Sequence, residues 1–137
     1  MLKRDYLVKQ FEEFGKVMAL LMGLKRDGNF PDLLEEIHKA AQKYTSTEIT
    51  FVESLQNDNL VNELTQNKKL NDDQLKMLAD LLFEKAEYYL KTVSTPLEST
   101  NCFKKAYTIY SFLKENATLN YSLDMHYKLE LLSKMNL

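Results

Sequence analysis

The chain has 137 residues, of which 45% are hydrophobic and 28% charged, with only 3 Gly and 2 Pro. This length and composition predict one domain over residues 1–137 and argue against a disordered chain, a β-barrel or a β-sandwich. The net charge of −2 excludes a broadly basic surface for nucleic acid, and the single cysteine, Cys102, excludes an internal disulfide.

The chain lacks the pattern of a membrane span or of a secretion leader. Its longest apolar run, Val17–Leu24, is eight residues long, whereas a span needs about 20. Acidic residues at Asp5, Glu12 and Glu13 interrupt the basic lead that a signal peptide requires. We therefore expect no membrane partner and a cytoplasmic location.

The first predicted helix ends at Gly28-Asn29, where two poor helix formers follow each other. Its apolar residues recur every three or four positions, which draws one stripe along the helix. This stripe consists of Leu7, Phe11, Phe14, Met18 and Leu21. Because Val17, Leu20 and Leu24 add a second stripe beside it, we expect a central helix packed on more than one side.

Two shorter segments follow. Pro31 stands where a first helical residue is favoured, and a third helix is predicted to begin near Thr47-Glu48. The sequence Asn57-Asp58-Asn59 predicts a break or kink in that third helix. The expected core residues are Leu33, Ile37, Ala40 and Tyr44, then Ile49, Val52 and Leu55, then Leu60, Val61 and Leu64.

Three further helices are predicted, of which the first two have start signals. Asn71, three residues before Gln74, predicts a capped start for a long fourth helix. In the fifth, Thr95 is the expected cap, Pro96 the first helical residue, and Glu98 the acid that reaches back to the cap amide. A last helix starts around Ser122. The expected core residues are Leu75, Leu78, Leu82, Ala86, Tyr89 and Val93, then Phe103, Ala106, Tyr110 and Leu113, then Met125, Leu129 and Leu132.

The segments together predict an all-α fold, because no stretch alternates apolar and polar residues with the period of a strand. We expect five to six antiparallel helices packed as stacked helical hairpins. The first hairpin resembles a tetratricopeptide repeat, whose apolar positions fall on Val17, Leu20, Leu21, Leu24, Leu33, Ile37 and Ala40. Residues 106–110 (AYTIY) resemble the small-then-aromatic pattern of the second helix of such a repeat. The chain departs from the repeat in having no Trp and in placing Leu21 at a small-residue position.

The chain also resembles a family of small bacterial proteins that have no assigned function. The resemblance rests on the opening MLKRDY, the helix and turn EEFGKVMALLMGLKRDGNF, and the helices LKMLADLLFEKAEYYL and CFKKAYTIYSFL. It covers most of the chain and implies a helical architecture in a bacterial cytoplasm. Because these are packing residues, the resemblance implies no catalytic or binding residue.

Residues that usually carry catalytic or metal chemistry are few and scattered. The chain has only His38, His126 and one cysteine, with neither HExxH nor paired CxxC. His38 is expected at the boundary of an apolar helix face, and Cys102 as a small core residue rather than a nucleophile. No Gly-rich phosphate loop is present. We therefore expect no metal, no cofactor and no catalytic residue.

Aromatic residues are the one compositional sign of recognition, since eight Tyr and seven Phe make up 11% of the chain. Because neighbouring aromatics on a helix cannot all face one core, Tyr88 and Tyr107 are predicted to face a partner. The alternative is that they form a second packing layer between hairpins.

The sequence therefore favours a non-enzymatic helical module that binds a protein or peptide partner. A homodimer closed by the apolar face of the first helix is another form of this function. The alternative from a different class is a small-molecule pocket or minor enzyme between the helices, with Tyr hydroxyls or His38 as its polar groups. A closed cavity with converging polar side chains would favour the pocket, whereas a shallow aromatic groove would favour the module.

Overall fold

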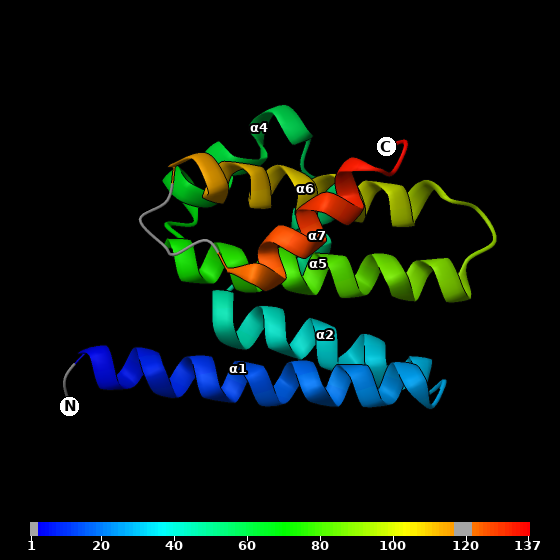
Figure 1. Cartoon of the computed structure of the whole chain (residues 1–137), viewed down its shortest axis with the longest axis horizontal. Helices are drawn as coiled ribbons and strands as arrows, with labels where there is room; N and C mark the ends of the chain where they lie inside the picture. The colour runs from blue at the N-terminus through cyan, green and yellow to red at the C-terminus, as the bar shows by residue number, and fades with distance from the viewer. Residues whose placement is uncertain (1–2, 117–121) are drawn as a thin grey trace.

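A computed structural model describes residues 3–116 and 122–137, which form helices and their connections without a β-strand (Figure 1). The elements are α1 (Lys3–Arg26), α2 (Phe30–Thr45), α3 (Ile49–Ser54), α4 (Asn57–Asn62), the π-helical turn η1 (Glu63–Asn67), α5 (Asp72–Thr92), α6 (Leu97–Asn116) and α7 (Leu123–Ser133). The all-α prediction is confirmed. Among these helices none is both long enough and apolar enough to cross a bilayer.

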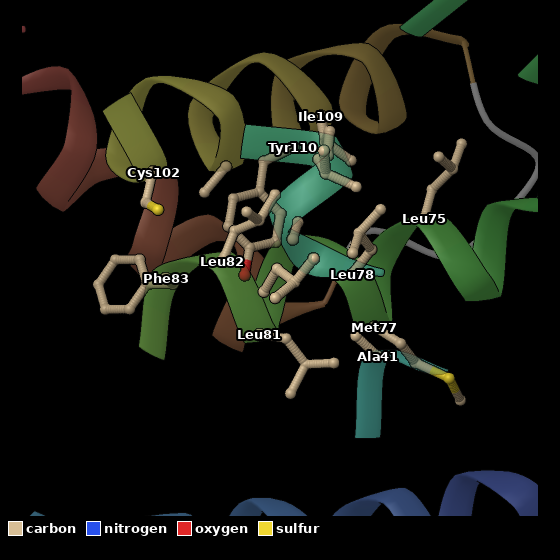
Figure 2. Close-up of a cluster of buried hydrophobic side chains, with 14 of the residues drawn as sticks. Ala41, Leu75, Met77, Leu78, Leu81, Leu82, Phe83, Cys102, Ile109 and Tyr110 are labelled. Carbon is tan, nitrogen blue, oxygen red and sulfur yellow. The ribbon is translucent and has the colours of Figure 1, made fainter. Parts of the chain in front are cut away.

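The central helix is α5. Every residue from Met77 to Ala86 is buried, so this helix is covered around its whole circumference. Helices α2 and α6 lie on opposite sides of it (Figure 1), and both pack against it. Figure 2 shows side chains of α5 gathered with Ala41 of α2 and with Cys102, Ile109 and Tyr110 of α6. The main hydrophobic core is therefore built around α5.

Helix α1 lies at the edge of the molecule, so the expectation that it is the central helix is wrong. Of its described apolar side chains only Phe14 and Leu21 are buried, and Leu20, in the second apolar stripe, is exposed. Figure 1 shows α2 along one side of α1, with the N-terminal part of α1 projecting beyond the end of α2. A second apolar stripe suits either a central helix or an exposed surface, and its spacing alone does not distinguish the two.

The predicted cap of α5 and the predicted start of the last helix around Ser122 are confirmed. The side chain of Asn71 accepts a hydrogen bond from the amide of Gln74, and the Gln74 side chain accepts one from the amide of Asn71. These reciprocal bonds satisfy two amides that have no partner inside the helix. At α7, the hydroxyl of Ser122 accepts a hydrogen bond from the amide of Met125.

The start of α6 differs by one residue from the prediction. The helix begins at Leu97, and the carbonyl of Pro96 accepts a hydrogen bond from the amide of Thr100, so Pro96 rather than Thr95 occupies the capping position. Glu98 contacts Thr95 through side chains, because the Thr95 hydroxyl donates to its carboxylate over 3.2 Å. The same residues thus mark the same helix start through a different bond.

The break in the third predicted helix also lies elsewhere. Helix α3 ends at Ser54, Leu55 and Gln56 are extended, and Asn57 begins α4. The Asn57-Asp58-Asn59 sequence therefore opens a helix instead of interrupting one, because Asn and Asp are favoured at helix starts as well as in turns. With α3 and α4 separate, the described ranges contain seven α-helices where five to six are expected.

Candidate partner-binding groove

Helices α1, α5 and α7 line an open groove of about 540 Å³, called here the α1–α5–α7 groove. The α1 wall consists of Phe11, Phe14, Gly15, Met18 and Met22. These residues recur at helical spacing, so a single face of α1 looks into the groove. Phe14 is buried beneath the wall, whereas Phe11 and Met22 are 41% and 63% exposed.

The opposite wall comes from α7. Tyr127 and Leu131 line the groove and are exposed to solvent. The other face of the same helix buries Met125, Leu129 and Leu132. Helix α7 is therefore apolar on two faces, of which one belongs to the core and the other stays uncovered.

Part of the groove floor is a cluster of two carboxylates and two ammonium groups that connects α7 to α5. Asp80 on α5 accepts hydrogen bonds from the buried Tyr110 hydroxyl, from Lys76 over 2.9 Å and from Lys128 over 3.3 Å. Asp124 lies 3.6 Å from the Lys76 ammonium and 3.5 Å from that of Lys128. Burial raises the pKa of Tyr110, and the Asp80 carboxylate raises it further. The hydroxyl therefore stays protonated and acts as the hydrogen-bond donor to Asp80.

Another part of the floor carries excess negative charge. The Lys25 ammonium of α1 lies 3.1 Å from a carboxylate oxygen of Glu84 and 2.8 Å from one of Glu87, both on α5. Burial raises the pKa of Glu84, although Lys25 opposes this effect. Two carboxylates that share one ammonium leave this part of the groove net negative.

A second polar cluster lies away from the groove and is enclosed between α2, α3, α5 and α6. The Glu53 carboxylate accepts hydrogen bonds from Lys85 over 2.6 Å, from the Tyr89 hydroxyl over 2.8 Å and from the Cys102 thiol over 3.4 Å. Lys85 is 2% exposed and also donates to Nε2 of His38 over 2.9 Å. This cluster ties the short helix α3 to the core.

The protonation states in the Glu53 cluster suit packing better than catalysis. Burial and the neighbouring Lys85 charge lower the pKa of His38, so its ring is neutral and accepts the lysine's hydrogen bond. Burial raises the pKa of Cys102, and Glu53 raises it further, which keeps the thiol protonated and poorly nucleophilic. No buried side-chain nitrogen or oxygen in the described ranges lacks a hydrogen-bond partner. Cys102 is buried and His38 is half-buried, as the sequence predicts.

The structure does not bring Tyr88 and Tyr107 together. Tyr88 is half-buried, with its ring centroid 6.4 Å from that of Phe30 and 5.6 Å from that of Tyr89. Tyr107 is 39% exposed on α6 and lines shallow depressions beside α7. Neither residue lines the α1–α5–α7 groove. Over residues 3–116 and 122–137, no group of three or more His, Cys, Asp or Glu side chains is arranged to hold a metal ion.

The sequence contains a spacing pattern for the groove wall, but this pattern overlaps with the main apolar stripe of α1. Phe11 and Met18 recur with Phe14 and Leu21, so all four read as one core stripe. In the structure Phe11 and Met18 join Met22 in the groove wall, at spacings of seven and four residues. These spacings define a second face of α1, but they do not show which of the two faces meets the core.

Comparison with protein-family models, with curated proteins and with solved structures found no match for this chain. Its function must therefore be inferred from the groove and its chemistry.

Proposed function

We propose that this protein is a non-enzymatic helical interaction module that holds one amphipathic helix of a partner in the α1–α5–α7 groove. The observation that carries the proposal is the exposure of large apolar side chains on both walls of one concave surface. Met22 on α1 and Tyr127 on α7 are 63% and 61% exposed. Fully burying an exposed large apolar side chain contributes about 1.5–3 kcal/mol, and these side chains are already partly covered. Each therefore contributes less than this, and a partner that fills the groove gains several such contributions.

The shape of the groove fits a helix. Three helix faces converge on it, from α1, α5 and α7, in the way that helices of a bundle surround a missing neighbour. The α1 wall from Phe11 to Met22 spans about 16 Å, which is three turns of an opposing helix. A helix with apolar residues at three- and four-residue spacing would present one such residue to each turn of the wall.

The polar groups support a binding module more than a small-molecule pocket or an enzyme. A small-molecule site needs an enclosed cavity with polar groups available to the ligand. The α1–α5–α7 groove is open, and its charged floor is already paired within the chain, as Asp80 with Lys76 and Lys128. In the enclosed Glu53 cluster the carboxylate is likewise occupied by Lys85.

The proposal includes tetratricopeptide-like stacking of helical hairpins. Helix α1 pairs with α2, α5 pairs with α6, and α2 packs against α5, which supports two hairpins stacked side by side (Figure 1). The bacterial cytoplasmic setting, and partner contacts through Tyr88 and Tyr107, stay predictions.

Site-specific photo-crosslinking tests the proposal. A photoreactive residue replaces Met22 in one variant and Leu20 in a matched control, because both are exposed on α1 but only Met22 lines the groove. Mass spectrometry then identifies the captured segments. We expect capture at Met22, and not at Leu20, of a segment with apolar residues at three- and four-residue spacing. Equal capture at both positions, or none at Met22, would show that the groove is not a docking site.

A further inference from the structure

We infer that the helix held in the α1–α5–α7 groove is α1 of a second copy of this chain, so that two copies form an antiparallel, two-fold pair. The inference rests on the proposed function, because it names the occupant of the same groove. In such a pair each copy contributes the same surface, and every contact occurs twice.

Charge complementarity points to α1 as the occupant. Residues 1–28 carry six basic and four acidic side chains, whereas the rest of the chain carries twelve basic and sixteen acidic ones. Helix α1 is thus the main element of the one clearly basic segment, and it begins with Lys3 and Arg4. The groove has the opposite bias, with more carboxylates than ammonium groups along its lining.

The antiparallel direction brings these opposite charges together. The C-terminal part of α1 carries Lys25, whose ammonium is shared by the Glu84 and Glu87 carboxylates of α5. An α1 that runs the opposite way places its own first turn toward this part of the groove. The N-terminal segment of each α1, whose sequence begins with two basic residues, is therefore directed toward the part of the other copy that carries excess negative charge.

Shape complementarity gives the register. A two-fold axis near the middle of the α1 wall places Phe11 against the partner's Met22, and Gly15 against the partner's Met18. Gly15 lines the groove, and a Cβ atom added there would have no neighbour within 4 Å. A glycine inside a helix destabilises it relative to alanine, but it also lets another helix approach closely. The open space at Gly15 is where the partner's Met18 fits.

The position of α1 permits this pairing. It is an edge helix of 24 residues beside an α2 of 16 residues, and its N-terminal part projects past α2 (Figure 1). Val8 in that part is 49% exposed and lies near the groove-facing side of α1, which extends the apolar surface beyond the groove. An uncovered helix at the edge can enter the groove of another copy without displacing an element of its own.

The first experiment measures the mass in solution, by sedimentation equilibrium over a range of concentrations. We expect the wild-type protein to have twice its chain mass of 16.1 kDa. Met22→Glu should raise the dimer dissociation constant roughly 100-fold or more, because the substitution is present twice in the interface. The matched control Leu20→Glu, on the exposed side of α1 away from the groove, should change it by less than about threefold. Circular dichroism confirms that both variants keep their helices.

Disulfide trapping tests the register. The double variant Phe11→Cys/Met22→Cys should form a covalent dimer on mild oxidation, because position 11 of one copy faces position 22 of the other copy. Each single variant should stay uncrosslinked, since its counterpart lies about 16 Å away and a disulfide needs Cα atoms within about 7 Å. The native Cys102 is buried and does not compete. A double variant that does not crosslink, or single variants that crosslink equally well, would overturn this register.

The outcomes separate this inference from the proposed function. A wild-type protein that is monomeric at every concentration overturns the self-pairing. If photo-crosslinking at Met22 then captures a helix of another protein, the module stands and only its occupant is wrong. If the protein is monomeric and Met22 captures nothing, both proposals fail.

Discussion

Helix α5 carries charged residues on two faces, and the two faces have different surroundings. On one face Lys85 is sealed between four helices with Glu53 and His38. On the other face Asp80 and Glu84 also have ammonium partners, but they form the floor of an open groove.

The main difference between these faces lies in the apolar cover. In the Glu53 cluster Lys85 and Cys102 are buried, and the bonds of the cluster hold α3 on α5 and α6. Around the groove the cover stops at two walls, where Met22 and Tyr127 stay exposed. Paired buried charges therefore stabilise the fold in both places, and the uncovered apolar walls are the main feature that indicates a partner.

The strongest test of this comparison removes the ammonium from the sealed face. Lys85→Met should lower the free energy of unfolding by about 3–5 kcal/mol, because the Glu53 carboxylate stays buried without its cation. Urea unfolding at pH 7 measures the change. The exposed Lys104→Met on α6 is the control and should stay within about 0.5 kcal/mol of wild type. A loss at Lys85 as small as that of the control would show that the sealed cluster contributes little.

A smaller loss is expected on the groove face. Tyr110→Phe removes a buried hydroxyl that donates to Asp80, and hydrogen bonds to charged groups contribute about 1.5–3 kcal/mol. Asp80 keeps Lys76 and Lys128, so the loss should be less than that of Lys85→Met. Urea unfolding measures it, with the exposed Tyr127→Phe as a control of unchanged stability. A loss that equals or exceeds that of Lys85→Met would reverse the ranking of the two faces.

Two of the three glycines of the first hairpin, Gly15 and Gly28, should respond to alanine with opposite signs. Gly15→Ala should stabilise the fold by about 0.5–1 kcal/mol, because Gly15 lies inside α1 with open space beside it. Gly28→Ala should destabilise it by about 1 kcal/mol, because Gly28 has φ +72° in the turn after α1. Thermal unfolding in a Met22→Glu background keeps any pairing of copies out of the comparison. Two changes of the same sign would contradict this account of α1.

The smallest effect concerns the pH dependence of Glu84. Burial raises its folded-state pKa above the ordinary value of 4.5, so ionisation of this carboxyl opposes folding. This destabilising effect of ionisation is absent at pH values below the ordinary pKa of 4.5, and it reaches its full size above the raised folded-state pKa of Glu84. Glu84→Gln should therefore gain stability relative to wild type as the pH rises from 4 to 7, while Lys25 keeps Glu87. Urea midpoints at both pH values measure this difference, and a gain at pH 4 that disappears at pH 7 would contradict the assignment.

The sequence predicts most local features of the fold because their causes lie within a few residues. The capping box of α5 joins Asn71 and Gln74, three positions apart, and the cap of α7 joins Ser122 and Met125. The spacing of apolar residues likewise predicts which face of α2 is buried. Where the prediction misplaces an element, as at Asn57, the same residue types suit both a helix start and a break.

The candidate groove is a different kind of feature. It depends on which of the two apolar faces of α1 meets the core, and both faces have helical spacing. Phe14 and Leu21 are buried while Met22 is exposed, a choice made by α2 and α5 and not by α1 itself. Tyr88 and Tyr107 both belong to the high aromatic content of the sequence. The packing of the helices, and not the sequence around each residue, places them in separate environments.

The sequence by itself determined the all-α class, most of the helices and the capping box of α5, since backbone hydrogen bonds and caps join near neighbours along the chain. Only the tertiary structure decided that α5 is central, that α1 lies at the edge, and that a groove opens between α1 and α7. Those features depend on contacts such as Lys25 with Glu84, 59 positions apart, and Lys85 with Glu53, 32 positions apart. No local spacing pattern encodes such a pair, because each partner's position is set by the packing of every helix between them.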